Sequence, residues 1–317
     1  MKPYRLRLLF KYSAFFLTFC LAIWLFRYPS RPYQHIKINT WTIVAADAVT
    51  GEVGVAGASC VPALHIDAVA AIVPGVGAAA VQADFTISNR DHVFQLLQEG
   101  MPAAAIIQQV SDLAYDRGVE TRQYGVVTIR NGQADAAAFT GSANFPWAGD
   151  MQDARMGVSV QGNFLVSEAV VRNSLEAFRF KDIDGHNTLA DRLMRALEAG
   201  SEAGGDARCN NGQVQQTASS AFLMVADGSG SPYAIRDFGR TDAGKPEAPR
   251  ISLSTAVERY GPNPVEELRR QYQELQIGSA TTPRSWKDLP ILLLGIGGFL
   301  LFGLFYLVFR RRFSGAK

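Results

Sequence analysis

The sequence is poor in the residues that usually build metal sites. Only three of its 317 residues are cysteines, and their spacings match no zinc-binding motif. The four histidines also lack the spacing of metal ligands: His35, His65, His92 and His186. Metal catalysis therefore has little support, and we expect no cofactor.

Charge is scarce as well. Charged residues make up 19% of the chain, whereas roughly a quarter is usual in globular proteins. The formal net charge is only +2 and no basic face stands out, so we expect no nucleic-acid partner. The low charge is explained by two apolar ends, which enclose a chain long enough for one large or two small domains.

The first apolar end has the features of a signal anchor. Three basic residues precede an apolar run over residues 8–26, as in a secretory signal or an anchor. The bulky, charged sequence at 25–29 offers no small-residue cleavage site. A buried core helix would leave the basic flank hard to place. We therefore expect an uncleaved membrane anchor over residues 1–27 and a polar connector over 28–39.

The second apolar run, residues 289–309, has about the length needed to cross a bilayer. It follows a predicted linker at 278–288 and precedes a basic tail at 310–317. By the positive-inside rule both termini lie in the cytoplasm, which predicts a two-pass membrane protein with its main domain, 40–277, outside the cytoplasm. A sorting tail that is later cleaved is the alternative.

The main domain begins with a hairpin pattern. Two β-prone runs, 40–47 and 53–60, flank the turn Thr50-Gly51-Glu52, and Thr40 stands at the front of the first run. Enzymes with an N-terminal nucleophile begin in this way: the side chain of the first residue attacks an amide, and its α-amine takes the proton. Residues 1–39 precede Thr40, so this role requires their removal. An ordinary threonine at a strand edge is the alternative.

The rest of the domain predicts alternating blocks of strands and helices. The strongest turn signal is Asn131-Gly132 between two β-prone runs. Further strands are expected at 69–73, 77–82, 157–162, 217–225 and 233–238, and helices at 88–97, 102–114, 167–178, 188–199 and 263–275. Antiparallel hairpins with helices in blocks favour a layered α+β fold.

Ten short motifs occur in the order of a known family. They are residues 40–47, 51–56, 75–78, 82–83, 139–142, 146–149, 160–163, 193–199, 204–208 and 263–270. Together they resemble the family named domain of unknown function 1028, which is placed in the N-terminal-nucleophile (Ntn) hydrolase superfamily. The resemblance covers roughly residues 40 to 275. It implies an α+β, four-layer αββα sandwich of two stacked antiparallel sheets, here flanked by two transmembrane helices.

The sequence also departs from this family in two respects. Typical members begin Met-Thr, so that removal of the initiator methionine exposes the threonine, whereas Thr40 here follows Asn39. The segment 59–84 contains no lysine at a proteasome-like position.

The resemblance implies two catalytic residues. Thr40 is the candidate nucleophile. Asn163 follows a predicted strand, and its side-chain amide is a candidate donor to an oxyanion, as an asparagine is in some relatives of the superfamily. A turn residue after Gly162 is an equal alternative for Asn163.

Four polar residues are candidates for substrate binding. Gln82 and Asp84 end an apolar strand, where pockets often lie, although they can equally be a helix cap and its neighbour. Asp206 and Arg208 follow two glycines and can pair bidentately beside a cleft. The alternative is a structural salt bridge that fixes a glycine-rich loop.

A disulfide is expected between Cys60 and Cys209. Cys60 ends the opening hairpin, and Cys209 ends the glycine-rich loop that this fold should bring near the strand ends. Two free buried thiols are the alternative.

These observations favour a membrane-anchored amidohydrolase outside the cytoplasm, which acts on a small amide or peptide-like bond through Thr40. The rival hypothesis is a non-catalytic Ntn-fold module for binding or assembly, tethered to the membrane. The mature N-terminus separates the two. The substrate and the oligomeric state, including a homo-oligomer, are left open.

Overall fold

The computed structural model describes residues 36–61, 66–180, 187–210, 216–229, 233–234, 250–257 and 261–281. The chain divides into two compact units, Met1–Leu268 and Arg269–Lys317. The first unit contains both sheets and every residue of the candidate site. In the second unit, the described residues continue helix α6 (Pro264–Thr281), on which Arg270 and Glu274 form an ion pair one helical turn apart.

One sheet is built around the predicted Asn-Gly hairpin. Its strand order is β11-β4-β5-β6-β7, and β1 also pairs with β5; all pairs are antiparallel. Asn131 and Gly132 join β6 and β7 with φ values of +51° and +72°, as a two-residue type I′ turn requires, so the predicted hairpin is confirmed. The strands are β1 (Ile36–Ile38), β4 (Ala70–Val73), β5 (Gly77–Phe85), β6 (Arg122–Arg130), β7 (Gln133–Thr140) and β11 (Tyr233–Ala234).

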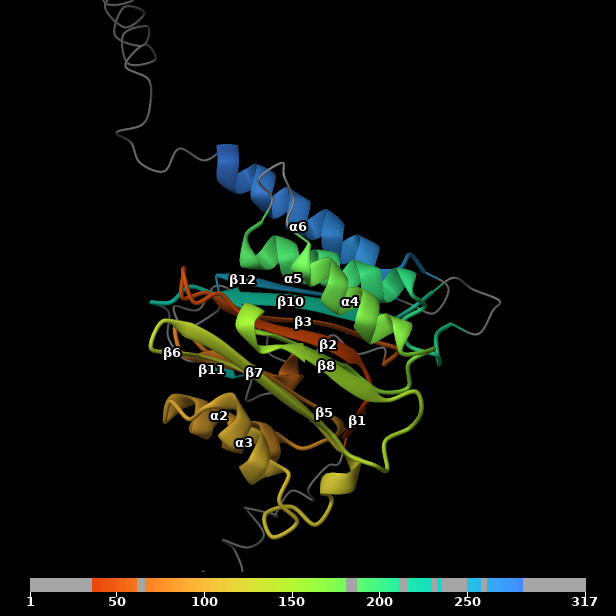
Figure 1. Cartoon of the computed structure of the whole chain (residues 1–317). Helices are drawn as coiled ribbons and strands as arrows, with labels where there is room; N and C mark the ends of the chain where they lie inside the picture. The colour runs from red at the N-terminus through yellow and green to blue at the C-terminus, as the bar shows by residue number, and fades with distance from the viewer. Residues whose placement is uncertain are drawn as a thin grey trace, which may run out of the picture. The chain divides into compact units, whose positions relative to one another are not determined.

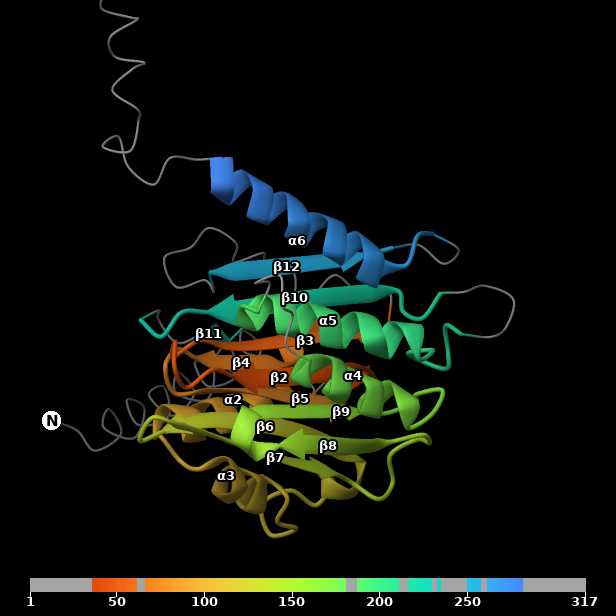
Figure 2. The same cartoon turned by 45° about the horizontal axis from the view of Figure 1, so that its top comes forward.

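The second sheet contains the opening hairpin. Its order is β12-β10-β3-β2-β9-β8, again antiparallel throughout (Figure 2). Every residue of β2 and β3 is buried, because helices cover one face of these strands and the first sheet covers the other. The strands are β2 (Trp41–Ala46), β3 (Val53–Ser59), β8 (Gly149–Asp153), β9 (Val158–Gly162), β10 (Ser220–Ala226) and β12 (Ile251–Ala256).

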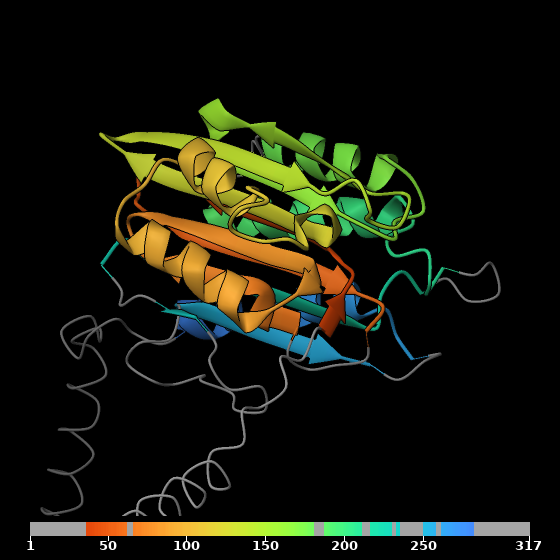
Figure 3. The same ribbon diagram turned by 90° about the horizontal axis from the view of Figure 1, so that it is seen from below.

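The layers follow in the order helices, sheet, sheet, helices (Figure 1). Helices α2 (Ile87–Gln98) and α3 (Ala103–Val110) cover the outer face of the first sheet, as the view from below shows (Figure 3). Helices α4 (Ala169–Arg179) and α5 (Leu189–Glu202) cover the outer face of the second sheet. Small and β-branched apolar side chains of the strands make up much of the buried core.

Local sequence explains where these helices begin. Thr188 and Asp191 form a reciprocal capping box at the start of α5, in which each side chain accepts a hydrogen bond from the other residue's backbone N–H. Thr86 caps α2 by accepting a hydrogen bond from the backbone N–H of Asn89 at 3.2 Å. Side-chain caps therefore fix the first turns of α2 and α5.

The structure corrects the predicted membrane segments. None of the helices in the described ranges combines the length and the apolar composition needed to cross a bilayer. On this finding the two flanking transmembrane helices, the anchoring through them and the two-pass localisation are not supported. The described chain is instead a mixed α/β structure with two sheets and five α-helices. Residues 1–27 and 289–309, to which those predictions refer, lie outside the described residues.

Candidate functional site

Thr40 lies where the chain crosses from one sheet to the other. The strand before it, β1, pairs with β5 in the first sheet, and the strand after it, β2, lies in the second sheet. Thr40 is only 1% exposed. Its Oγ1 donates a hydrogen bond to the carbonyl oxygen of Ala58 at 2.5 Å. The hydroxyl is therefore held against β3 at the edge of the sheet sandwich.

The peptide bond before Thr40 has two side-chain donors on its carbonyl oxygen. Ser59 Oγ donates to Asn39 O at 2.5 Å, and Arg208 Nη2 donates to the same oxygen at 2.8 Å. Ser59 is in place because β3 pairs with β2, and Arg208 comes from the glycine-rich loop after α5. Two donors on one carbonyl oxygen form the arrangement that stabilises negative charge on that oxygen.

Asp206 orients Arg208. Its carboxylate, which is fully buried, accepts Arg208 Nε at 2.9 Å and Nη2 at 2.5 Å, so the pair is bidentate. The same carboxylate accepts the backbone N–H of Cys60 at 3.0 Å. This contact joins the loop to the end of β3, next to Ser59. The structure thus brings Asp206 and Arg208 beside Thr40, and Arg208 rather than Asp206 reaches the Asn39 carbonyl.

The expected disulfide joins the same two segments. Cys60 and Cys209 are bonded, with their Cα atoms 5.5 Å apart and 149 positions of chain between them. The bond follows Ser59 on one side and Arg208 on the other, so it holds both donors of the Asn39 carbonyl in one place.

Gln82 and Asn163 bind the carbonyl of Thr40 itself. Gln82 Nε2 donates to Thr40 O at 3.0 Å, and the backbone N–H of Asn163 donates to it at 3.2 Å. The side-chain Nδ2 of Asn163 donates to Gln123 Oε1 at 2.8 Å, and its Oδ1 has no hydrogen-bond partner among the residues that the structure describes. Both residues therefore lie beside Thr40, but the amide of Asn163 is directed at Gln123.

Sequence reasoning missed the polar network that lies between the sheets. Gln123 Oε1 also accepts from Gln82, and its Nε2 donates to the carbonyl of Gly162 at 2.8 Å. The network continues through buried residues in a chain of hydrogen bonds: Gln82–Thr42 at 2.7 Å, Thr42–Gln161 at 2.5 Å and Gln161–Ser159 at 2.8 Å. The signal in the sequence is one glutamine within each of the three strands β5, β6 and β9.

Asp84 is not at this site. It pairs with Arg122 at 3.5 Å and accepts a hydrogen bond from Thr121 Oγ1 at 3.2 Å. Arg122 also pairs with Asp116 at 2.7 Å. Burial raises the pKa of Asp116, but hydrogen bonds from Arg122, Gly118 and Asn89 together bring its pKa below 3.8. This cluster lies at the start of β6 and is structural.

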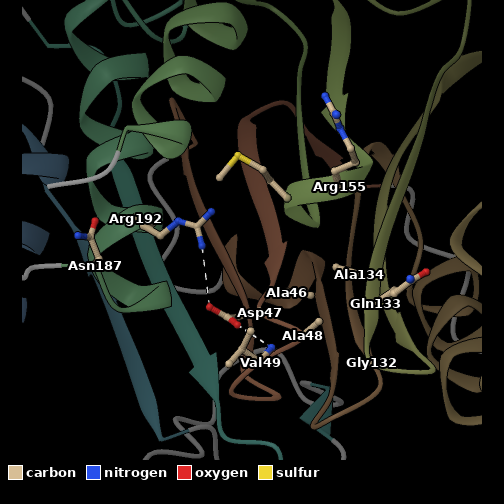
Figure 4. Close-up of a pocket in the computed structure, with 11 residues that line it drawn as sticks. Ala46, Asp47, Ala48, Val49, Gly132, Gln133, Ala134, Arg155, Asn187 and Arg192 are labelled. Carbon is tan, nitrogen blue, oxygen red and sulfur yellow. Dashed lines mark hydrogen bonds and ion pairs between the residues drawn. The ribbon is translucent and has the colours of Figure 1, made fainter.

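A separate pocket lies at the opposite end of β2. Its volume is about 820 Å³, and it is lined from the turn after β2, the β6–β7 turn, the 3₁₀ helix η3 (Ala154–Met156) and the start of α5 (Figure 4). Asp47 follows Thr40 by seven residues, so extended backbone places it roughly 20 Å away. The pocket is thus distinct from the Thr40 site. Within the described part of the chain, no group of three or more His, Cys, Asp or Glu side chains is placed to hold a metal ion.

Comparison with known proteins identifies a family and a solved structure that resemble this chain. The profile of a family of unknown function, DUF1028, matches residues 40–268. Among solved structures, the crystal structure of protein SPO2555 from Silicibacter pomeroyi, also assigned to DUF1028, is similar with a TM-score of 0.55 and 25% sequence identity. The similarity covers 78% of this chain and 91% of that one. No curated protein matches this chain.

Proposed function

The chain belongs to the DUF1028 family, and we propose that it is an amide-bond hydrolase of the Ntn type with Thr40 as its nucleophile. Membership of the family does not by itself assign a superfamily or an activity, and the proposal supplies both. It rests on one observation above all: the carbonyl of the peptide bond that precedes Thr40 has two side-chain donors, Ser59 Oγ and Arg208 Nη2.

The first reaction of such an enzyme is hydrolysis of its own Asn39–Thr40 bond. Thr40 Oγ1 attacks the carbonyl carbon of Asn39, and the carbonyl oxygen gains negative charge that Ser59 and Arg208 stabilise. The C–N bond then breaks, and the hydroxyl proton passes to the nitrogen, which becomes the free α-amine. Water hydrolyses the resulting ester, which leaves a carboxylate on Asn39 and restores the Thr40 hydroxyl. The free amine is the base that an N-terminal nucleophile needs.

The same groups would then act on a substrate. A substrate carbonyl bound to Thr40 Oγ1 takes the place of the Asn39 carbonyl, so the same two donors face its oxygen. Residues Lys37 to Asn39 occupy the acyl side of this site, and Lys37 lies in a strand paired with Asp84 of β5. An extended backbone is therefore accommodated there, which supports a small amide or peptide-like substrate.

The experiment is to determine the mature N-terminus of the purified full-length protein by intact mass and N-terminal sequencing. We expect a fragment that begins at Thr40, and its loss in Thr40→Ala. Thr40→Ser keeps a hydroxyl and should retain cleavage. Thr50→Ala, in the exposed turn after β2, is the matched control and should be cleaved normally. A full-length protein that hydrolyses amides with residues 1–39 attached would eliminate this mechanism.

The second candidate is a non-catalytic binding or assembly module of the same fold. The observation in its favour is that Thr40 is internal and buried, with its hydroxyl already donating to Ala58. Stable full-length protein that neither cleaves itself nor hydrolyses amides would favour this module over the enzyme.

A further inference from the structure

The pocket near Asp47 contains an arginine whose charge is incompletely matched. The side chain of Arg192 is only 14% exposed, and its guanidinium stacks 4.0 Å from the ring centroid of Phe178. Its Nε donates to the carbonyl of Phe178 at 3.4 Å. Across the part of the chain that the structure describes, its terminal nitrogens make no hydrogen bond, and their one ionic contact is Nη1 to Asp47 Oδ2 at 4.0 Å.

Asp47 is held away from Arg192 by its own turn. Its Oδ1 accepts backbone N–H groups of Val49 at 2.9 Å and Thr50 at 3.3 Å. These bonds fix the carboxylate as an Asx-type cap of the β2–β3 turn. Burial lowers the pKa of Arg192, Asp47 raises it and the positive charge of Arg195 lowers it further, with a net lowering, so Asp47 does not fully offset the other two effects. An additional anion at the terminal nitrogens would supply the missing partner.

The remaining walls of the pocket suit the body of a small organic molecule. Arg155, on η3, has no ion-pair partner in the described ranges and lies at the rim (Figure 4). Met156 and Ala134 contribute apolar groups to the lining. A volume of about 820 Å³ falls within the range that accommodates small ligands, roughly 300–1,000 Å³. Two guanidinium groups against one carboxylate leave the pocket net positive.

We propose that this pocket binds a small organic anion, whose carboxylate or phosphate group docks on Arg192 and whose apolar body lies against Met156 and Ala134. A guanidinium fork matches both kinds of oxyanion because its two parallel N–H groups face two oxygens. The site is independent of the Thr40 chemistry, since it lies at the other end of β2.

Binding is tested by calorimetric titration of the full-length protein with four probes: butyrate, butyl phosphate, inorganic phosphate and butylamine. We expect both butyl anions to bind and butylamine, which has the same apolar body and the opposite charge, not to bind. Comparison of butyrate with butyl phosphate identifies the preferred head group. Comparison of butyl phosphate with inorganic phosphate measures how much the apolar lining contributes to binding affinity.

Arg192→Gln should weaken binding of the anion at least about tenfold, because one charge-assisted hydrogen bond is lost. Arg172→Gln is the matched control, because Arg172 is an exposed arginine on α4 paired with Glu168, and it should bind as the parent does. Gln133→Glu provides a second test that leaves Arg192 and its stacking intact. It adds a negative charge at an exposed position of the lining and should weaken binding of the anions.

Two results would overturn the proposal. One is no binding of either butyl anion to the parent protein at concentrations up to ~10 mM. The other is equal binding to the parent, Arg192→Gln and Gln133→Glu, which would place the anion elsewhere. Neither result bears on cleavage at Thr40, so the two proposals fail separately.

Discussion

The carbonyl oxygen of Asn39 accepts a hydrogen bond from Nη2 of Arg208, a residue 169 positions further along the chain. The peptide bond before the candidate nucleophile is thus positioned by a distant loop. That loop is itself held by the buried carboxylate of Asp206 and by a disulfide. The chemistry proposed at Thr40 therefore depends on contacts that form only in the complete fold.

Removal of one donor should slow cleavage without unfolding the protein. Ser59→Ala takes away the hydroxyl that reaches Asn39 O and leaves the Asp206–Arg208 pair intact. Loss of one such donor typically reduces a rate about 100-fold or more. We expect the fraction that begins at Thr40, followed over time by intact mass, to fall accordingly. Ser111→Ala, at the end of α3 and far along the chain from the site, should leave the time course unchanged, and an unaltered rate in Ser59→Ala would contradict the assigned role.

The disulfide should contribute to stability and to the site together. Replacement of Cys60 and Cys209 by serine should lower the free energy of unfolding by about 2–5 kcal/mol, because the bond closes a long loop of chain. Urea denaturation measures this loss. Reductant should destabilise the parent by a similar amount and leave the double variant unaffected. A double variant as stable as the parent would show that contacts of the loop suffice.

Gly125 should be coupled to Gln161. A Cβ atom at Gly125 would lie 2.0 Å from Gln161 Oε1, far inside van der Waals contact. We expect Gly125→Ala to cost about 1–3 kcal/mol through overpacking. Gln161→Ala also destabilises, because Thr42 and Ser159 lose their partner. The double variant should lose less than the sum of the two, as a double-mutant cycle in denaturant measures; strict additivity would contradict the proposed clash.

Asp116 should make stability depend on pH in the acid range. Although burial raises its pKa, its hydrogen bonds bring the pKa below 3.8 in the folded state. The ionised form therefore contributes stability above that value, and this contribution is lost as the pH falls through the lower folded pKa. Asp116→Asn should be less stable than the parent near pH 7, and the difference should shrink near pH 3. Urea denaturation at both values checks this, and Glu202→Gln, at an exposed carboxylate on α5, should show no such trend.

The sequence predicts the parts of the fold that have strong local signals. The opening hairpin, the Asn131-Gly132 turn and α5 lie close to their expected bounds. Strands β1, β8 and β12 were not expected. β1 has three residues and exists through its pairing with β5, whereas β8 is polar and half-buried and so shows no alternation. The membrane prediction came from hydropathy at the two ends, and no described helix supports it.

For the site, the sequence pointed to Thr40, Arg208 and the disulfide, and the structure brings them together. The role of Ser59 was not expected, because a serine without a nearby histidine carries no sequence signal for donation to a carbonyl. Gln123 was missed for a similar reason. Its partners Gln82 and Asn163 lie 41 and 40 positions away, and only strand pairing reveals them.

Because β1 lies in the first sheet and β2 in the second, the Asn39–Thr40 peptide bond links the two sheets covalently. Its three residues pair with Ala83 to Phe85, so after hydrolysis this short ladder, the buried side chain of Ile38 and the contact of Lys37 with the ring of Phe145 would hold the strand. Ordered strands protect their amides from exchange with solvent, and short ladders open readily. Cleavage should therefore raise the deuterium uptake of residues 84 and 85, while the part of β5 that pairs with β6, Gly77 to Ala83, stays protected. Cleavage would thus let the backbone amides at this edge of the first sheet exchange with solvent.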